Sequence, residues 1–398
     1  MAVIEVSPKP AHELSLPDSD VSDGFGAYVH IPFCRVRCGY CDFNTYTNTD
    51  FGSGASVGDY HESLMREIEI SARYLTEHEN GAGLTSVFFG GGTPTMLNAS
   101  QLVAVLDRLR EQFGVVDDAE ITTEANPETV DRQALQILKD GGFNRVSFGM
   151  QSAVPHVLAT LERQHSPGQV TKVAQWAREV GLEYSVDLIY GAPGESLADW
   201  QRSLDAAIAL EPGHISAYGL TIEPGTAMGR QVRRGELPDT DPDEQAAKYE
   251  IAEAMLTGAG YSWYEVSNWA KPGKHSRHNM AYWRNTNWWG YGPGAHSHIN
   301  GTRFWNVKHP GAYAQHLLAG NLPIADVEHL TDTEQREEAI MLGVRLAEGI
   351  AIPDGTQPRV IAGLIADELV DPAAALSGRI VLTLRGRLLA DTVIRALW

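Results

Sequence analysis

Short apolar runs alternate with longer amphipathic stretches over the first two thirds of the chain. Runs of β-branched and aromatic residues predict six buried strands, at 27–31, 86–89, 120–123, 145–148, 185–189 and 214–218. Apolar positions at helical spacing predict five helices between them, at 60–74, 101–113, 132–140, 169–180 and 197–210. Repeated strand–helix units favour an α/β fold with a parallel sheet and right-handed crossovers, either doubly wound or a barrel.

The two ends of the chain follow other patterns. Residues 1–24 are rich in Pro, Asp and Ser without periodicity, so we expect a mobile N-terminal tail. A helix is predicted at 243–256, and a stretch rich in Trp, Tyr, Asn and Gly follows at 261–305. We therefore expect a strand–helix core at 25–235, an aromatic- and histidine-rich extension at 236–324, and a small C-terminal module at 325–398.

The C-terminal module is predicted to be mainly helical. Its helices are expected at 333–347 and 360–368, with a short β pair around Arg385 and Gly386 and a last helix toward Trp398. This order resembles a small winged-helix-like module. We interpret it as a packing domain rather than a DNA reader, because the chain is strongly acidic.

Composition and charge narrow the range of partners. The chain has 398 residues, of which 43% are apolar, so it can bury a large core. Its 31 Lys and Arg residues face 51 Asp and Glu residues, and the formal net charge of −20 opposes binding to nucleic acid. The sequence shows neither a signal peptide nor an uncharged apolar stretch of membrane-spanning length. We expect a cytoplasmic protein without an integral membrane segment.

All three cysteines of the chain lie within eight residues, directly after the first predicted strand. Cys34, Cys38 and Cys41 form a poor disulfide framework and indicate a ligand cluster in a reducing compartment. Three thiolates can bind three irons of a cubane cluster and leave the fourth iron open for another ligand. The alternatives are a zinc site, which needs a fourth ligand such as His30 or His278, and three unrelated core cysteines.

Glycines and polar residues follow the ends of the predicted strands, where active-site groups gather in a parallel α/β barrel. The segment 90–94 (Gly-Gly-Gly-Thr-Pro) follows the second strand, Glu124 ends the third, 149–152 follows the fourth, and Asp187 lies on the fifth. Taken singly, the glycines fit a tight turn, and a buried carboxylate can be satisfied by backbone N–H groups. Their shared position at strand ends favours a site.

The cysteine spacing Cys-x3-Cys-x2-Cys after a first strand, with these strand-end motifs, resembles the radical S-adenosylmethionine (SAM) enzymes. The resemblance implies a partial (β/α)6-type TIM barrel. It implies that Cys34, Cys38 and Cys41 bind a [4Fe-4S] cluster whose open iron chelates the amino and carboxylate groups of SAM. It also implies SAM contacts from nine residues: Tyr28, Tyr40, Gly91, Gly92, Thr93, Glu124, Gln151, Arg163 and Asp187.

Two features separate branches of this superfamily. Segments 187–194 and 221–226 and the C-terminal module resemble the anaerobic coproporphyrinogen oxidase group. Dehydrogenases of that group carry a further cysteine two positions after the third, and Phe43 stands there in this chain. The segment 278–283 (His-Asn-Met-Ala-Tyr-Trp) is instead similar to the H-N-x-x-Y-W motif of HemW-type heme chaperones, which bind heme and hand it to acceptor proteins.

The second resemblance implies that the chain is a heme chaperone. Heme would be bound by His278, Asn279, Tyr282 and Trp283, with His278 as the iron ligand. A neutral imidazole is a good axial ligand and aromatic surface shields a porphyrin, although an aromatic stretch is more often packed core. The implied partners are heme and a heme-acceptor protein, respiratory or membrane-associated.

Two other functions stay open on the sequence. One is an oxygen-independent coproporphyrinogen III dehydrogenase, a radical SAM oxidoreductase that decarboxylates its substrate. The other is a zinc-stapled binding module without catalytic activity.

Overall fold

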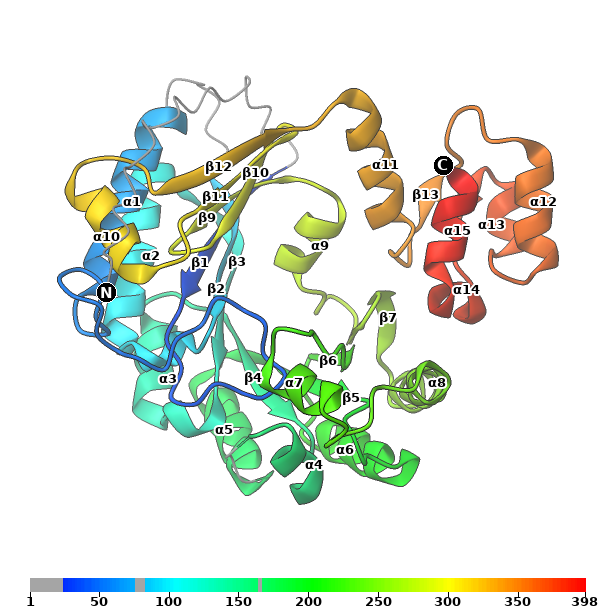
Figure 1. Ribbon diagram of the computed structural model, residues 1–398, viewed down its shortest axis with the longest axis horizontal. Helices are drawn as coiled ribbons and strands as arrows, with labels where there is room; N and C mark the ends of the chain where they lie inside the picture. Colours follow the sequence, from blue (N-terminus) through cyan, green and yellow to red (C-terminus); the bar gives the residue numbers. More distant parts are fainter. Residues whose placement is uncertain (1–23, 76–82, 164–166) are drawn as a thin grey trace. The chain divides into compact units, whose positions relative to one another are not determined.

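The computed structural model describes residues 24–75, 83–163 and 167–398 (Figure 1). The predicted tail therefore lies outside the described residues, apart from Gly24. Contacts within the chain divide it into two compact units. The first comprises the described parts of segments 1–35, 44–119 and 286–331. The second comprises the described parts of segments 36–43, 120–285 and 332–398.

The first unit is a mixed sheet flanked by helices (Figure 1). Strand β1 (Phe25–Ile31) pairs in parallel with β2 (Leu84–Gly91) on one side and with β9 (Asn287–Tyr291) on the other. Antiparallel strands continue the sheet from β9: β10 (His296–Ile299), β11 (Thr302–Asn306) and β12 (Ile324–His329). Helix α1 (Tyr60–Leu75) packs against α2 (Ala99–Phe113) and α10 (Pro310–Leu318).

A buried carboxylate ties α1 to the strands of the first unit. Glu67 accepts hydrogen bonds from the Gly292 backbone N–H at 2.8 Å, from Asn306 Nδ2 at 2.6 Å and from the Tyr313 hydroxyl at 2.5 Å. Burial raises the pKa of Glu67 to about 7, and these three donors oppose the rise. The contacts fix the turn after β9, where Gly292 lies against the backbone of His30.

The second unit carries a run of four parallel strands. Strand β3 (Val115–Ala125) begins in a segment of the first unit and ends in the second, where it pairs with β4 (Arg145–Gln151). β5 (Glu183–Tyr190) and β6 (His214–Gly219) continue the parallel run, and β8 (Asn268–Ala270) and β7 (Ser262–Glu265) follow antiparallel. The helices that accompany these strands are α3 (Arg132–Asp140), α4 (Pro155–Thr160), α5 (Pro167–Val180), α6 (Leu197–Ala209), α7 (Ala227–Arg233), α8 (Pro242–Gly258) and α9 (Arg277–Trp283).

The alternation of strands and helices predicted from the sequence is confirmed. Each of the six predicted strands lies inside one of β1 to β6, and each of the five predicted helices matches α1, α2, α3, α5 or α6. The strand pairs that the structure describes do not close into a full barrel, which agrees with a partial one. Within the described ranges, no helix is both long and apolar enough to cross a bilayer.

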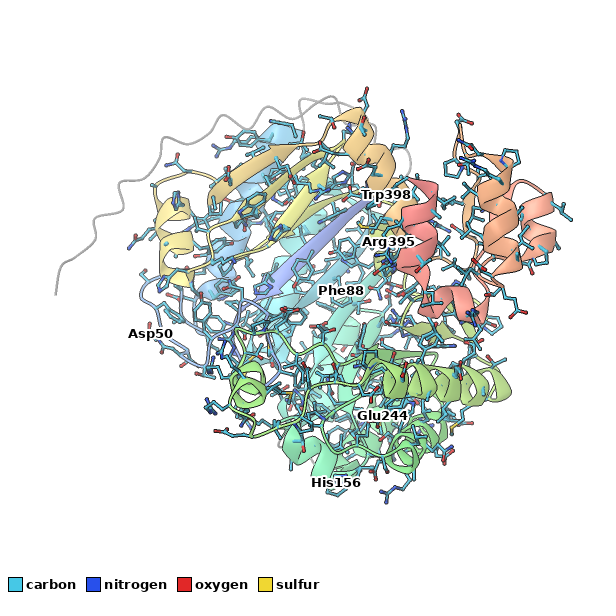
Figure 2. The ribbon with its side chains drawn as sticks, turned by 45° about the vertical axis from the view of Figure 1, so that its right-hand side comes forward. Asp50, Phe88, His156, Glu244, Arg395 and Trp398 are labelled. Carbon is cyan, nitrogen blue, oxygen red and sulfur yellow. The ribbon has the colours of Figure 1, made fainter. Side chains whose placement is uncertain are left out.

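The C-terminal module has its own small core. Its elements are α11 (Asp332–Gly343), β13 (Ile350–Ala351), α12 (Pro358–Ala366), α13 (Pro372–Leu376), β14 (Arg379–Ile380), α14 (Leu384–Leu388) and α15 (Ala390–Leu397). Val344, Ile380 and Val393 are among its fully buried apolar side chains. Figure 2 shows Arg395 on α15 and the C-terminal Trp398, whose side chain is exposed.

One prediction for this module is wrong. Arg385 and Gly386 do not form a β pair but lie in helix α14, and the β pair joins β13 to β14 instead. Two local features explain the helix. The Thr383 hydroxyl caps its start by accepting a hydrogen bond from the Gly386 N–H at 2.9 Å. Gly386 is needed for close packing, because a Cβ there would come within 1.9 Å of the Leu369 carbonyl oxygen.

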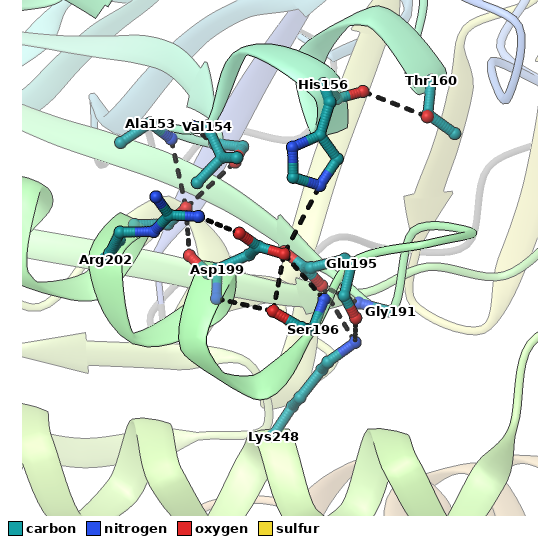
Figure 3. Close-up of polar contacts among 12 residues, drawn as sticks. Ala153, Val154, His156, Thr160, Gly191, Glu195, Ser196, Asp199, Arg202 and Lys248 are labelled. Carbon is teal, nitrogen blue, oxygen red and sulfur yellow. Dashed lines mark hydrogen bonds and ion pairs between the residues drawn. The ribbon is translucent and has the colours of Figure 1, made fainter.

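A buried lysine ties α8 to the loop after β5 (Figure 3). The Lys248 ammonium lies 3.2 Å from Glu195 Oε2 and 2.7 Å from Glu244, and it donates to the Glu195 carbonyl at 2.7 Å. Glu195 Oε2 also accepts from the Gly191 N–H at 2.7 Å. Burial raises the pKa of Glu195, while the Gly191 hydrogen bond and the Lys248 charge oppose this. The ion pair therefore holds the loop that follows β5, the strand that carries Asp187.

Candidate functional site

The first cysteine is held by the ends of β1 and β2 in the first unit. Cys34 is buried, and its N–H donates to the Tyr46 carbonyl at 2.9 Å. The Thr93 hydroxyl lies 3.7 Å from Cys34 Sγ, within hydrogen-bonding distance of sulfur. A Cβ on Gly92 would lie 2.7 Å from the Phe33 carbonyl oxygen and 2.9 Å from Cys34 Sγ. The glycine is therefore required for the loop to pass close to β2.

The other two cysteines belong to the second unit. The Cys41 N–H donates to the Cys38 carbonyl at 3.1 Å, and Met228 donates to the Gly39 carbonyl at 2.8 Å. Arg163 Nη1 donates to Cys38 Sγ at 3.5 Å, while its Nη2 donates to the Gly149 carbonyl at 3.1 Å. Arg163, which the sequence predicts to lie beside the cofactor, thus contacts a cysteine sulfur.

The donor set fits an iron–sulfur cluster. All three thiols are free of disulfides, and donors from Thr93 and Arg163 reach two of the sulfurs, which stabilises thiolates. In the part of the chain that the structure describes, no three metal-binding side chains are already gathered as a site. His30, considered as a fourth zinc ligand, has both ring nitrogens hydrogen-bonded, to the Tyr28 hydroxyl and to the Asn44 carbonyl, each at 3.0 Å.

The glycine triplet lies at the end of β2, beside Tyr28. Gly91 has φ +109°, and a Cβ there would lie 2.5 Å from the His30 ring, so no other residue fits without movement. The Tyr28 ring stacks on Phe88, with ring centroids 6.4 Å apart, and Figure 2 labels Phe88 on β2. The first unit therefore brings Tyr28, the triplet and Cys34 to neighbouring strand ends.

Three of the predicted SAM residues of the second unit lie on strands: Glu124 and Gln151 at the ends of β3 and β4, and Asp187 within β5. Asp187 is half-buried and accepts hydrogen bonds from the hydroxyls of Ser147 at 2.8 Å and Ser216 at 2.7 Å. Burial raises the pKa of Asp187, and the two serines oppose the rise. Gln151 adopts φ +58°, and its Oε1 is buried with no partner among the described residues. A buried unpaired acceptor at a strand end is consistent with a site for a polar ligand.

Tyr40 lies in the cysteine loop, near Cys38, Cys41 and Arg163. Burial raises the pKa of Tyr40, and negative charge on Cys38 and Cys41 raises it further, while Arg163 lowers it. Its hydroxyl is thus a neutral donor at physiological pH.

The motif helix α9 presents its histidine as a neutral base. His278 is buried, and its Nε2 lies 2.9 Å from the Tyr282 hydroxyl. Burial alone lowers the pKa of His278 to about 3. The Ser276 hydroxyl caps the helix by accepting from the Asn279 N–H at 3.3 Å. His278 and Tyr282 are therefore brought together, one helical turn apart, with a deprotonated imidazole at neutral pH.

The motif residues share electrostatic surroundings with the strand-end carboxylates of the second unit. The negative charge of Glu124 adds to burial in raising the pKa of Tyr282. Burial raises the pKa of Glu265 to about 8, and hydrogen bonds from Asn268 and Trp283 oppose the rise. Trp283 thus faces the hairpin of β7 and β8, and Tyr282 faces the end of β3.

Sequence reasoning missed several residues of this neighbourhood: Glu120, Arg145, Ser147, Ser216, Tyr218 and Glu265. Tyr218 is 42% exposed, but desolvation of its hydroxyl and the negative charges of Asp187, Glu265 and Glu124 raise its pKa, so the hydroxyl lies near these carboxylates. The available signal was a charged residue inside a predicted buried strand, which is rare without a partner. Glu120 and Arg145 each begin such a strand.

Comparison with known proteins agrees with this arrangement. The sequence profile of the radical SAM superfamily matches residues 28–207, the stretch that contains the cysteine loop and the strand-end motifs. The solved structure of coproporphyrinogen III oxidase (HemN) from Escherichia coli, a radical SAM enzyme, superposes with a TM-score of 0.79 at 25% identity, covering 94% of this chain and 90% of that one. The fold and the strand-end motifs thus define a radical SAM protein.

Closer relatives narrow the class. The chain is 46% identical over 376 residues to the heme chaperone HemW of Mycobacterium tuberculosis, covering 94% of each chain. It is 35% identical over 382 residues to the heme chaperone HemW of Bacillus subtilis, covering 93% of this chain and 98% of that one. The chain belongs to the HemW family.

Proposed function

We propose that this protein binds heme and transfers it to an acceptor protein in the cytoplasm, and that Cys34, Cys38 and Cys41 hold a [4Fe-4S] cluster with SAM at its open iron. Membership of the HemW family supports the heme reading. The observation that carries it is the buried, deprotonated His278 on the motif helix, because a neutral imidazole is what heme iron binds.

The residues of the chain divide the work. A cluster with one open iron supplies electron transfer and a chelation point for SAM when it is bound. Thr93 and Arg163 donate to cysteine sulfurs, and Asp187, held by two serines, offers a hydrogen-bonded carboxyl for a polar ligand. His278 offers nitrogen to heme iron, with Tyr282 and Trp283 as aromatic surface beside it.

The test for heme is an anaerobic hemin titration followed by the Soret band, on wild type and His278→Ala in parallel. A saturable one-to-one shift that the variant loses supports the proposal and places the ligand at His278. Equal binding by both proteins would support heme binding but would show that a residue other than His278 is the iron ligand. An absence of saturable binding to the wild type overturns the proposal.

The test for the cluster is replacement of all three cysteines by alanine, followed by anaerobic reconstitution. We expect the variant to lose the bound iron and sulfide and the absorbance of the cluster near about 400 nm. Zinc without iron or sulfide in anaerobically purified wild type would favour the zinc-stapled module instead.

The likeness to HemN keeps coproporphyrinogen III dehydrogenase as a second candidate. Against it, the side chain at the position of the additional cysteine is Phe43, and it is 62% exposed. Anaerobic conversion of coproporphyrinogen III to protoporphyrinogen by reconstituted protein would establish this activity.

A further inference from the structure

A buried ion pair holds the start of the motif helix. Glu120 on β3 and Arg145 on β4 lie 3.4 Å apart, with side chains 9% and 10% exposed. Glu120 Oε1 accepts from the Ser276 hydroxyl at 3.2 Å and from the His278 N–H at 3.1 Å. Glu120 Oε2 accepts from the Arg277 N–H at 2.9 Å.

Arg145 holds the residues just before the helix. Its Nη1 donates to the Lys274 carbonyl at 3.2 Å and to the His275 carbonyl at 3.3 Å. Glu120 therefore accepts hydrogen bonds from the backbone N–H groups at the start of α9, and Arg145 donates to the backbone carbonyls of the turn before it. The first N–H groups of a helix have no partner within the helix, so both sets of backbone groups need such partners when buried.

The pair bonds to one segment of the chain. Among the described residues, the hydrogen bonds of the two charged groups go to each other and to residues 274–278. The ion pair itself joins the neighbouring strands β3 and β4, and the remaining hydrogen bonds of the two groups leave the sheet for this segment. Because both groups are largely removed from water, their hydrogen bonds are strong, and the loss of either partner leaves an uncompensated charge.

The same strand reaches the other end of the motif. Glu120 and Glu124 are four residues apart on β3, so their side chains lie on one face of the strand. Glu120 bonds to the backbone of His278, and Glu124 acts on Tyr282 one helical turn later. His278 is thus held at two points: its backbone N–H donates to Glu120, and its ring Nε2 lies 2.9 Å from the Tyr282 hydroxyl.

We propose that Glu120 and Arg145 are positioning residues for heme: they set the place of the His278 imidazole by clamping residues 274–278. This inference rests on the proposed function, because it concerns the histidine assigned there to heme iron.

The first arm of the test needs no heme. Hydrogen–deuterium exchange of the Arg277 and His278 amides is measured in wild type, Glu120→Gln, and Asp117→Asn as a matched control from an exposed position of the same strand. Loss of the charged acceptor is expected to speed exchange of these amides by about tenfold or more in Glu120→Gln, and Asp117→Asn should leave it unchanged. Unchanged amide exchange in Glu120→Gln would contradict the inference that Glu120 holds residues 274–278 in place.

The second arm uses hemin. The Soret band and electron paramagnetic resonance spectrum of one-to-one hemin complexes are compared, together with the rate of hemin release to apomyoglobin. Glu120→Gln should bind hemin with a changed ligand-field spectrum and release it faster by about tenfold, whereas Asp117→Asn should match wild type. Faster amide exchange with an unchanged spectrum and release rate overturns the positioning role.

Arg145→Lys is the second variant, should Glu120→Gln fail to fold. It keeps the charge beside Glu120 but loses the guanidinium geometry that reaches both carbonyls, so its hemin spectrum should change in the same direction. A spectrum and release rate identical to wild type would contradict the proposal. A wild type that binds no hemin would overturn the proposed function and the positioning role for heme, while the exchange arm would still report on the clamp itself.

Discussion

Beside Cys34, the backbone of Gly92 leaves room only for a hydrogen atom. The atoms that a Cβ would meet include two backbone carbonyl oxygens, of Phe33 and Ile31, and these cannot move as a flexible side chain does. The loop that carries the thiols is therefore set by the lack of a side chain at one position. If the three cysteines hold the proposed cluster, a side chain at this position would hinder its assembly.

We predict that Gly92→Ala impairs cluster assembly. Overpacking of this kind costs about 1–3 kcal/mol, and here it displaces the Cys34 sulfur. Reconstituted variant should hold a minor fraction of the wild-type iron and sulfide, measured by chemical analysis. Gly363→Ala, in a helix where a Cβ meets nothing within 4 Å, is the control and should bind as wild type does. Full iron content in Gly92→Ala would show that the loop adapts.

The buried His278 also makes a prediction about pH. Burial lowers its pKa from 6.5 to about 3, so between these values the unfolded chain binds a proton that the folded chain excludes. This group therefore reduces the free energy of unfolding as the pH falls below 6.5, and it has no such effect above about pH 7.

The stability difference between wild type and His278→Gln should therefore shrink as the pH falls. We expect the change to exceed about 1 kcal/mol between pH 7 and pH 5, measured by urea unfolding at both values. A difference that is constant with pH would mean that His278 is not buried in its neutral form.

At the scale of elements, regular alternation was predictable and short buried strands were not. Strands β1 to β6 have dense apolar runs, which predicted their positions within a few residues. The strands of the aromatic stretch, such as β7 and β9, have four or five residues and are buried on both faces over part of their length, so no alternation marks them. Motifs in the sequence indicated the cysteines and the strand-end residues as a candidate site, and the roles of these residues stay a prediction. The contacts of Glu120 and Arg145 with residues 274–278 were not predictable, because hydrogen bonds to a distant backbone segment leave no pattern in the local sequence.

The tie between α8 and the loop after β5 gives a prediction about stability. Removing one partner of a buried ion pair leaves the other charge without compensation, which costs about 3–5 kcal/mol. Lys248→Met should lower the free energy of urea unfolding by this amount, because Glu195 stays buried. The double variant with Glu195→Gln should recover part of the loss. Lys172→Met, an exposed control on α5, removes only a surface cation–π contact with Trp176 and should change stability by less than about 1 kcal/mol.

At the scale of the whole molecule, the sequence gives charge and class but not the grouping of segments. β1 and β9 pair directly although more than 250 residues of chain lie between them, and no local pattern reports such a contact. Likewise the C-terminal module contacts the rest of the second unit through side chains that no sequence pattern indicates. Arg387 of α14 lies 2.8 Å from Glu253 and 4.3 Å from the centre of the Trp263 ring.

We predict that Arg387→Gln loosens the C-terminal module. The variant loses a charge-assisted hydrogen bond and a cation–π contact, which together are worth about 2–4 kcal/mol. Amide exchange should speed up across 332–398 and stay unchanged in β4 and β5, as measured by mass spectrometry. Arg395→Gln, on α15 of the same module, is the control. Equal exchange in both variants would mean that Arg387 does not hold the module in place.

The close approach of Gly386 to the Leu369 carbonyl has a consequence for sequence drift in this module. Gly349 is in the same situation, since a Cβ there would come within 1.9 Å of the Ile380 carbonyl oxygen. A mutation at either position collides with backbone, so no compensating side-chain change elsewhere can rescue it. Surface positions such as Leu376, 88% exposed, carry no such restriction. We therefore expect related modules to retain glycine at both positions even where the rest of their sequence differs.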